Sequence, residues 1–292
     1  MVRIFGGLIG AFFVMMLVLA LGDGIYTAAT TKTEETAEHA FHKKPKEVKF
    51  AHDGMFGKYD RAQLQRGFKV YKEVCAACHS MNLVAFRNFA EIGYNEDEVK
   101  AIAKGWPTET PSIDPETGEA SSRPSIPADK IPLVYPNEVA ARAANNGALP
   151  PDLSLITKAR HDGPAYVYSL LTGYQKQPAE LKKKFPDVAA GSGSDPRDPK
   201  KAPGTLHYNP YFANLNIAMA APLTGEGQVT YDDGTKATVD QMARDVSSFL
   251  TWTAEPKMEN RKTAGWAALI FLIIFTGLAF MSYKTIWADK KH

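Results

Sequence analysis

The hydrophobic positions of the chain form two long uninterrupted runs, with shorter periodic segments between them. The C-terminal run, residues 263–283, contains no charged residue. At about 1.5 Å per residue, a helix of this length crosses roughly the 30 Å hydrocarbon core of a bilayer. Trp266 and Tyr283 lie near its ends, where interfacial aromatic residues are typical. The pattern predicts one transmembrane anchor at 263–283, followed by a cytoplasmic tail at 284–292.

The N-terminal run, Ile4 to Gly22, follows Arg3 and ends in small residues, as secretory signals do. It is longer than the usual apolar segment of a signal peptide, so residues 1–22 are predicted to be either a cleaved signal or an N-terminal membrane segment. Either kind of segment carries the chain that follows it across the membrane. We therefore expect a polar arm at 23–49 and a domain at 50–258 on the outer side.

The periodic segments between the two runs predict short helices joined by long loops. Leu64, Phe68 and Tyr71 recur at helical spacing after Asp60, a suitable N-cap residue. The other helices are expected at 136–144, where Gly147 suits a left-handed cap, at 164–171, and along 239–250 with Met242 facing the core. The seven prolines of 106–136 predict a long loop, and the Asp-Gly pair in 231–235 predicts a tight hairpin turn. The fold class is therefore mainly α.

Composition and charge limit the classes of function that the chain can have. The chain has 292 residues and a net charge of +2, so it gives no indication of a nucleic-acid partner. Charge is uneven, because residues 91–119 contain eight acidic side chains against Lys100 and Lys104. Such an acidic region can steer a basic partner, and it is a candidate docking surface. Any single charge in it is more simply explained as part of a solvated loop surface. The insertion at 182–204 has no assigned role.

The only two cysteines, Cys75 and Cys78, are followed directly by His79. A structural zinc site needs four ligands, but no other cysteines exist and the remaining histidines are not paired at short spacing. A redox dithiol should begin a helix in a βαβ unit, whereas a helix precedes this motif. Cys-x-x-Cys-His is the signature of c-type haem attachment, in which both thiols bond to the haem and the imidazole lies beneath the iron. A disulfide without function is the less favoured alternative.

The second axial ligand must come from a distant part of the chain. Met55 and Met81 are too close to the motif, and other methionines lie in membrane runs, in the core or in a charged run. Spacing alone favours Met219, in a loop bracketed by prolines, with His161 and His207 as rivals. A methionine ligand raises the iron potential and favours electron transfer over oxygen binding.

Several blocks resemble the cytochrome c1 family, the haem-bearing subunits of cytochrome bc1 complexes, in its alphaproteobacterial and mitochondrial form. The resemblance extends from residue 56 to the C-terminus, and its order of blocks is more specific than the five-residue motif. These blocks are residues 66–75, 143–154, 158–161, 208–212, 231–235 and 254–256. The family implies a helical c-type cytochrome domain with long loops and insertions.

The resemblance also implies roles for individual residues. Cys75 and Cys78 would be the thioether sites of one covalent haem c, with His79 and Met219 as axial ligands. The residues implied to line the haem pocket are Asn145, Ala148, Leu149, Pro150 and Pro151. Arg160 and Tyr166 would lie near the propionates, although Arg160 could also be an ordinary surface arginine. Ala220 and Ala221 depart from the proline-rich sequence common after the methionine, so this loop would be slightly less rigid.

The function implied is an electron relay in ubiquinol–cytochrome c reductase. Electrons would pass from the Rieske iron–sulfur subunit to a soluble or membrane-bound c-type cytochrome, in a dimeric complex that also contains cytochrome b. The complex would lie in the cell inner membrane with the haem domain in the periplasm, and no residue would act as a catalytic acid, base or nucleophile. The alternatives are a stand-alone membrane-anchored cytochrome, a haem-based gas sensor and a thiol oxidoreductase.

Overall fold

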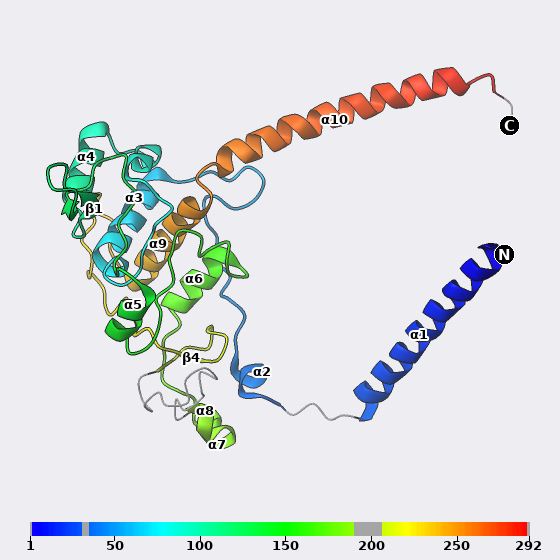
Figure 1. Cartoon of the computed structure of the whole chain (residues 1–292), viewed down its shortest axis with the longest axis horizontal. Coiled ribbons are helices and arrows are strands. Elements are labelled where there is room, and N and C mark those ends of the chain that lie inside the picture. Colours follow the sequence, from blue (N-terminus) through cyan, green and yellow to red (C-terminus); the bar gives the residue numbers. More distant parts are fainter. Residues whose placement is uncertain (1, 31–34, 190–205, 291–292) are drawn as a thin grey trace. The chain divides into compact units, whose positions relative to one another are not determined.

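The computed structural model describes residues 2–30, 35–189 and 206–290 (Figure 1). The chain divides into two compact units, residues 1–40 and 41–292, and each is described by itself. The first contains α1 (Val2–Thr30) and most of α2 (Ala37–Phe41). The elements of the second are α3 (Arg61–Val70), η1 (Tyr71–Cys75), η2 (Phe86–Ile92), α4 (Glu96–Lys104), β1 (Thr110–Ile113), β2 (Ala120–Arg123), α5 (Glu138–Ala144), α6 (Gly163–Leu171), α7 (Ala179–Lys184), α8 (Pro186–Ala189), β3 (His207–Tyr208), β4 (Asn216–Ile217), α9 (Val239–Ala254) and α10 (Met258–Trp287).

The predicted fold class is confirmed, since helices dominate the described residues and the strands are few and short. The helices expected near 60–71, 136–144, 164–171 and 239–250 are α3, α5, α6 and α9. Asp60 caps α3 by accepting a hydrogen bond from the Gln63 amide, as expected. Gly147 follows α5 with φ +79, and its amide bonds to Arg142 O at 2.7 Å.

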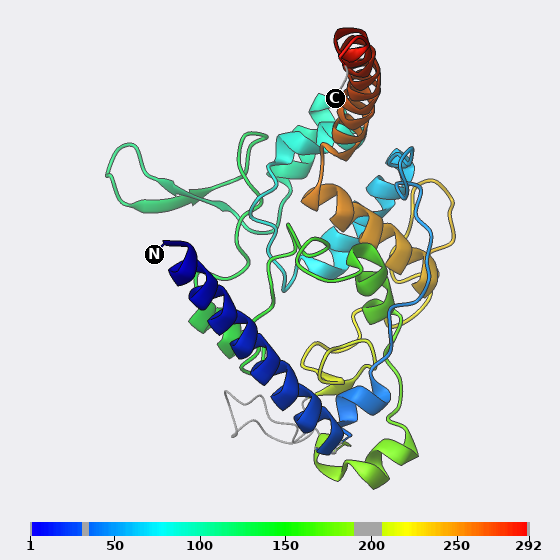
Figure 2. The same ribbon diagram turned by 90° about the vertical axis from the view of Figure 1, so that its right-hand side faces the viewer.

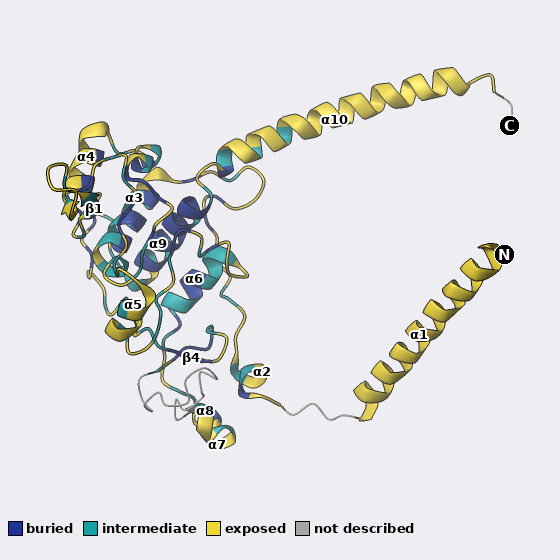
Figure 3. Ribbon diagram, viewed as in Figure 1, coloured by how far each residue is buried: buried dark blue, intermediate teal, exposed yellow. Residues whose placement is uncertain are grey.

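Among the described residues, two helices, α1 and α10, are long and apolar enough to cross a membrane, judged by length and composition. Both are exposed along their apolar stretches (Figure 3). The helix α10 begins at Met258, before the uncharged run, and the helix α1 continues to Thr30, beyond the apolar run that ends at Gly22. The structure thus contains two candidate spans, where the sequence predicts one definite anchor and leaves the N-terminal segment open.

The core of the second unit lies between α3 and α9, which make its most extensive contact, with α6 also against α9 (Figure 3). Aromatic rings fill this interface: the Phe68 centroid lies 4.3 Å from that of Phe89 and 5.7 Å from that of Phe249. Each such buried side chain contributes on the order of 1.5–3 kcal/mol. Met242 on α9 is completely buried, which confirms its predicted place in the core.

A buried carboxylate connects the same two helices. The Asp245 side chain on α9 is fully buried and accepts hydrogen bonds from Arg66 Nε at 3.0 Å and Gln63 Nε2 at 3.1 Å, both on α3. Gln241 donates a third bond at 2.8 Å. Because an unpaired buried charge is costly, these donors are needed for the helices to pack this closely.

Two sequence predictions about β structure are wrong. Residues 106–136 are not only loop, because β1 and β2 pair antiparallel with Thr110 opposite Arg123. Asp114 closes their turn by accepting from the Glu116 and Thr117 amides, and Gly118 has φ +72. Because prolines are typical of loops, the sequence pattern did not indicate this hairpin.

The segment 231–235 forms its predicted turn, with Gly234 at φ +77, but no strands flank it. Charge pairs with α3 hold the turn instead. Asp233 accepts from Arg66 at 2.6 Å, and Asp232 accepts from Lys69 at 2.8 Å. Of the 182–204 insertion, the structure describes α8 and the end of α7, and residues 190–204 lie outside the described part.

Candidate haem-attachment site

The cysteine motif follows directly from the helix α3. At Tyr71 the helix widens into one π-helical turn, η1, in which the Ala76 amide bonds to Tyr71 O at 2.8 Å. The amides of Cys78 and His79 then both bond to Cys75 O, at 3.1 and 2.9 Å. This tight turn brings Cys75, Cys78 and His79 together, as haem attachment requires.

The His79 ring is oriented by a backbone carbonyl. Its Nδ1 lies 2.8 Å from Pro151 O, and because a carbonyl only accepts, Nδ1 must carry the proton and donate. Burial lowers the pKa of His79, which favours the neutral imidazole. The lone pair is then on Nε2, the nitrogen free to bind a metal. The Tyr71 hydroxyl donates to His79 O at 3.1 Å and fixes the backbone of the same residue.

The two thiols are not arranged as a redox pair. Both are free, Cys75 half-buried and Cys78 exposed. Burial, together with the nearby Cys78, raises the pKa of the Cys75 thiol to about 12. A thiol with a raised pKa is a poor nucleophile, and its position at the end of a helix gives it no help from the helix dipole. Cys75, the first cysteine of the motif, is therefore not activated as the nucleophile of a thiol oxidoreductase would be.

The segment predicted to line the haem pocket runs alongside the motif. The Leu153 amide bonds to Ser80 O at 2.8 Å, and the Asn82 amide bonds to Asp152 Oδ2 at 2.8 Å. Pro151 contacts His79 as described above. Leu149 and Pro150 precede it and are half-buried. The structure therefore places residues 149–151 next to the cysteine motif.

Asn145 and Ala148 are both half-buried and lie just before this segment. The Asn145 amide group donates to Tyr135 Oη at 3.0 Å and to Ala141 O at 2.7 Å, and the Ala148 amide bonds to Asn145 O. Asn145 thus shapes the chain between α5 and the proline segment.

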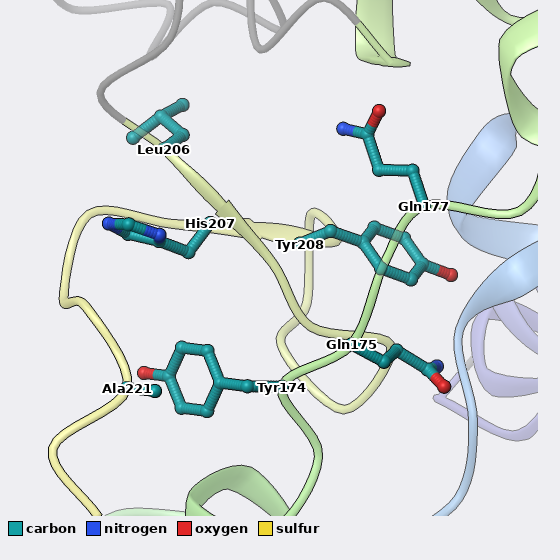
Figure 4. A pocket seen from close by; sticks show the side chains of 7 residues that line it. All are labelled: Tyr174, Gln175, Gln177, Leu206, His207, Tyr208 and Ala221. Atoms are coloured by element: carbon teal, nitrogen blue, oxygen red, sulfur yellow. The ribbon is translucent and has the colours of Figure 1, made fainter. Parts of the chain in front are cut away.

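Met219 lies two residues after β4 and is half-buried. The Tyr174 hydroxyl donates to Met219 O at 3.0 Å and fixes the loop. Figure 4 shows the Tyr174 ring beside Ala221 in a shallow pocket that His207 and Tyr208 also line. His161 and His207, the rival ligands, are both exposed.

Arg160 and Tyr166 lie next to each other at the start of α6. Burial raises the pKa of the Tyr166 hydroxyl, and the neighbouring Arg160 guanidinium opposes that shift. Arg160 is exposed and bonds to its neighbour's carbonyl, Ala159 O, at 3.1 Å; it forms no ion pair with any residue that the structure describes. A guanidinium that has no carboxylate partner among the described residues and lies beside a phenol suits a carboxylate such as a haem propionate.

The predicted residues form two groups. The first is the cysteine motif with residues 145–151. The second is Arg160, Tyr166 and Met219: Arg160 lies beside Tyr166, and Tyr174, which is near Tyr166, bonds to Met219 O. No hydrogen bond or ion pair between described residues joins Met219 to the motif. Both groups border one hydrophobic core, because Cys75 and Tyr166 pack against the same cluster.

The residues of this site fit a covalent haem. They provide two thiols on one turn, an imidazole whose Nε2 is free, and a guanidinium that pairs with no carboxylate of the described residues. By contrast, no three His, Cys, Asp or Glu side chains in the described ranges are grouped so as to hold a bare metal ion.

Sequence reasoning missed two supporting residues, Tyr71 and Tyr174. Tyr71 contributes to the helical spacing that predicts α3 and its ring is buried, but its hydroxyl also bonds to His79 O. Tyr174 follows α6 in an irregular segment without periodicity, so no pattern could connect it with a methionine 45 residues later.

We predict that Tyr174→Phe loosens the Met219 loop, because it removes one hydrogen bond worth about 0.5–1.5 kcal/mol. The absorption band of methionine-ligated ferric haem should then disappear at a lower temperature than in the wild type. Tyr208→Phe is a matched control, since Tyr208 lines the same pocket without a hydrogen bond from its hydroxyl to any described residue. Equal behaviour of both variants would contradict the role of Tyr174.

Comparison with known proteins identifies the family of the chain. A model described as the Cytochrome C1 family matches residues 50–290. The chain is 43% identical over 248 residues to cytochrome c1 of Rhodospirillum rubrum, covering 82% of this chain and 86% of that protein. It is 44% identical over 263 residues to the mitochondrial cytochrome b-c1 complex catalytic subunit of Candida albicans, covering 90% and 83%.

A protein of Bradyrhizobium diazoefficiens named cytochrome b/c1 is 47% identical over 257 residues. That match covers 85% of this chain but 36% of the relative, so the chain spans about a third of this longer protein. The matched family region contains the cysteine motif, the proline segment and Met219 together. The chain therefore belongs to the cytochrome c1 family.

Proposed function

We propose that the chain is the haem-bearing electron-transfer subunit of a cytochrome bc1 complex, a ubiquinol–cytochrome c reductase. It would carry one haem c bound covalently through Cys75 and Cys78, with His79 and Met219 as axial ligands. When bound, the haem iron supplies reversible one-electron chemistry at a potential that the methionine ligand raises. The observation that carries the proposal is the His79 ring, held by Pro151 O so that Nε2 is free.

The protein's own residues hold and shield the redox group. His79 is kept neutral and oriented, and Tyr174 holds the backbone of Met219. The half-buried Leu149 and Pro150 exclude water from the side next to the motif. Arg160 would pair with a propionate. These roles involve no proton transfer, so the subunit contributes electron transfer and no acid–base or nucleophilic step to the reductase.

The electron donor would be the Rieske iron–sulfur subunit and the acceptor a soluble or membrane-bound c-type cytochrome, with cytochrome b as the membrane partner in a dimeric complex. The name of one relative, a catalytic subunit of a cytochrome b-c1 complex, supports assembly with other subunits. Anchoring by α10 would place the haem domain on the periplasmic side of the inner membrane, with 284–292 as the cytoplasmic tail. Residues 1–22 would be a signal or a second membrane segment, and 23–49 a polar arm.

Purification from membranes tests the assembly. The full chain, tagged at its C-terminus, should be isolated with a multi-span cytochrome b and an iron–sulfur protein, and quinol should reduce its haem. Recovery of the chain alone, with haem that quinol does not reduce, would favour a stand-alone membrane-anchored cytochrome.

The acidic region 91–119 is our candidate docking surface for a basic acceptor. Internal pairs already neutralise part of it, because Glu96 and Asp97 pair with Lys100 and Glu91 pairs with Lys257. The β1–β2 hairpin extends from the domain (Figure 2). Its exposed Glu116 and Glu119 form no ion pair with described residues, so they remain available to an acceptor.

We predict that replacing both Glu116 and Glu119 with lysine slows reduction of a basic cytochrome about tenfold at low ionic strength, since steering depends on the local field. The measurement is the second-order rate as a function of salt, whose slope should also flatten. Reversing Glu180 and Glu226, which lie outside the acidic region, gives a control with the same change in net charge. Equal rates in the two double variants would show that the hairpin is not part of the docking surface.

A further inference from the structure

The loop 51–58 lies beside the start of α10 (Figure 1). It carries two large apolar side chains, Met55 and Phe56. Met55 is 61% exposed and Phe56 is 76% exposed. Neither residue takes part in the haem site. Adjacent apolar side chains with this exposure mark an interaction surface when their surroundings identify the partner.

Defined contacts fix the shape of the loop, so the exposure of its tip follows from the fold. The Lys58 amide bonds to Ala51 O at 3.1 Å and closes the loop at its base. A Cβ on Gly57 would lie 2.0 Å from Asp53 O, so this close approach requires glycine. Gly54 adopts φ +70 just before the apolar pair.

The loop is fixed to the helix that would enter the membrane. Lys262 Nζ on α10 donates to His52 O at 2.7 Å and to Gly57 O at 3.1 Å. The Phe56 ring stacks on Trp266 with centroids 5.0 Å apart and planes 4° apart. Lys262 and Trp266 are one helical turn apart, so a single face of α10 holds the loop.

These contacts set the level of the loop tip along α10. Trp266 belongs to the uncharged run 263–283 and lies near its first residue, where interfacial tryptophans are found. Phe56, stacked on Trp266, must lie at the same level, and Met55 is next to it. Lys58 at the base of the loop is exposed and forms no ion pair with any described residue, as suits a neighbour of lipid phosphate.

We propose that the loop 51–58 is a second membrane contact, with Met55 and Phe56 inserted at the boundary between headgroups and acyl chains. The inference rests on the proposed membrane span of α10 and adds a lipid-binding surface to it. An anchor of one helix leaves a domain free to tilt, whereas a loop that is fixed to the helix and also touches lipid would limit that tilt.

The test uses the full chain, isolated with its accompanying subunits and placed in phospholipid nanodiscs. In the holoprotein Cys75 and Cys78 are bonded to haem, so an introduced cysteine can carry an environment-sensitive fluorophore, with the labelled wild type as background. The probe is Met55→Cys, which keeps the Phe56–Trp266 stack. Val139→Cys, 78% exposed on α5, is the aqueous control, and Phe271→Cys in the middle of the α10 run is the membrane control.

Nanodiscs of ordinary and brominated phospholipid are compared, so that quenching by the haem cancels in the ratio. We expect brominated lipid to lower the emission at position 55 about twofold, and that at 271 at least as much, with no change at 139. Quenching at 271 without quenching at 55 would overturn the inference and leave the span intact. A blue-shifted but unquenched label at 55 would place the loop against protein and would also overturn it. Absence of quenching at 271 would instead refute the membrane span.

Discussion

Replacing Met219 with leucine should remove one axial ligand and lower the reduction potential by on the order of 0.1 V or more. Leucine is close in volume, so the loop held by Tyr174 should remain folded. The open position should then bind carbon monoxide, and transfer to the c-type acceptor should slow because the driving force is smaller. The measurements are a redox titration and the carbon monoxide difference spectrum of the reduced protein.

Met242→Leu is the matched control for this variant. It makes the same chemical change at a fully buried position on α9 that has no role at the iron, and it should leave both spectrum and potential unchanged. If Met219→Leu also leaves them unchanged, Met219 is not the ligand. His161→Ala or His207→Ala should then produce the loss instead. A wild-type protein that binds carbon monoxide at once would support the gas-sensor alternative.

Replacing Gly67 with alanine should destabilise the haem domain by about 3 kcal/mol, because overpacking of a close helix contact forces the backbones apart. The new Cβ would lie 2.1 Å from Asp245 O and 2.6 Å from Phe249 Cβ. The clash is with backbone and cannot be relieved by a change of rotamer. For a domain of this size we expect the melting temperature to fall by roughly 10 °C.

Gly225→Ala provides the comparison, because a Cβ at that position meets nothing within 4 Å. It should melt within about 1 °C of the wild type or slightly above it, since alanine restricts the unfolded chain. Thermal unfolding followed by circular dichroism measures both variants. Equal melting temperatures would show that α3 and α9 do not approach as closely as described.

The residues that follow a regular period were the ones that could be predicted from the sequence. Leu64 and Phe68 indicate α3, and both the Asp60 cap and the core position of Met242 are confirmed. The hairpin β1–β2 could not be found this way. Its turn is closed by the Asp114 side chain, which accepts hydrogen bonds from the turn amides, and its strands have no alternating apolar face.

The candidate site divides in the same way. Cys75, Cys78 and His79 are adjacent in sequence, so their chemistry is readable from spacing. The partners of His79 and Met219 are not readable from spacing. Pro151 O is a backbone atom 72 residues from His79, and Tyr174 acts through the carbonyl of Met219. The 231–235 segment shows the opposite error, since an Asp-Gly turn signal is present but Arg66 and Lys69 hold the turn in place of strands.

The central claim is that Cys75 and Cys78 hold the haem covalently, and the most direct measurement is the alkaline pyridine haemochrome spectrum of the purified chain after extraction with acidified acetone. We predict that one haem per chain stays with the protein through the extraction and gives the band position of a haem whose two vinyl groups are saturated. Replacing both cysteines with serine should release all of the haem into the solvent. A wild-type chain that loses its haem to the solvent, or that gives no haemochrome band, would contradict the account.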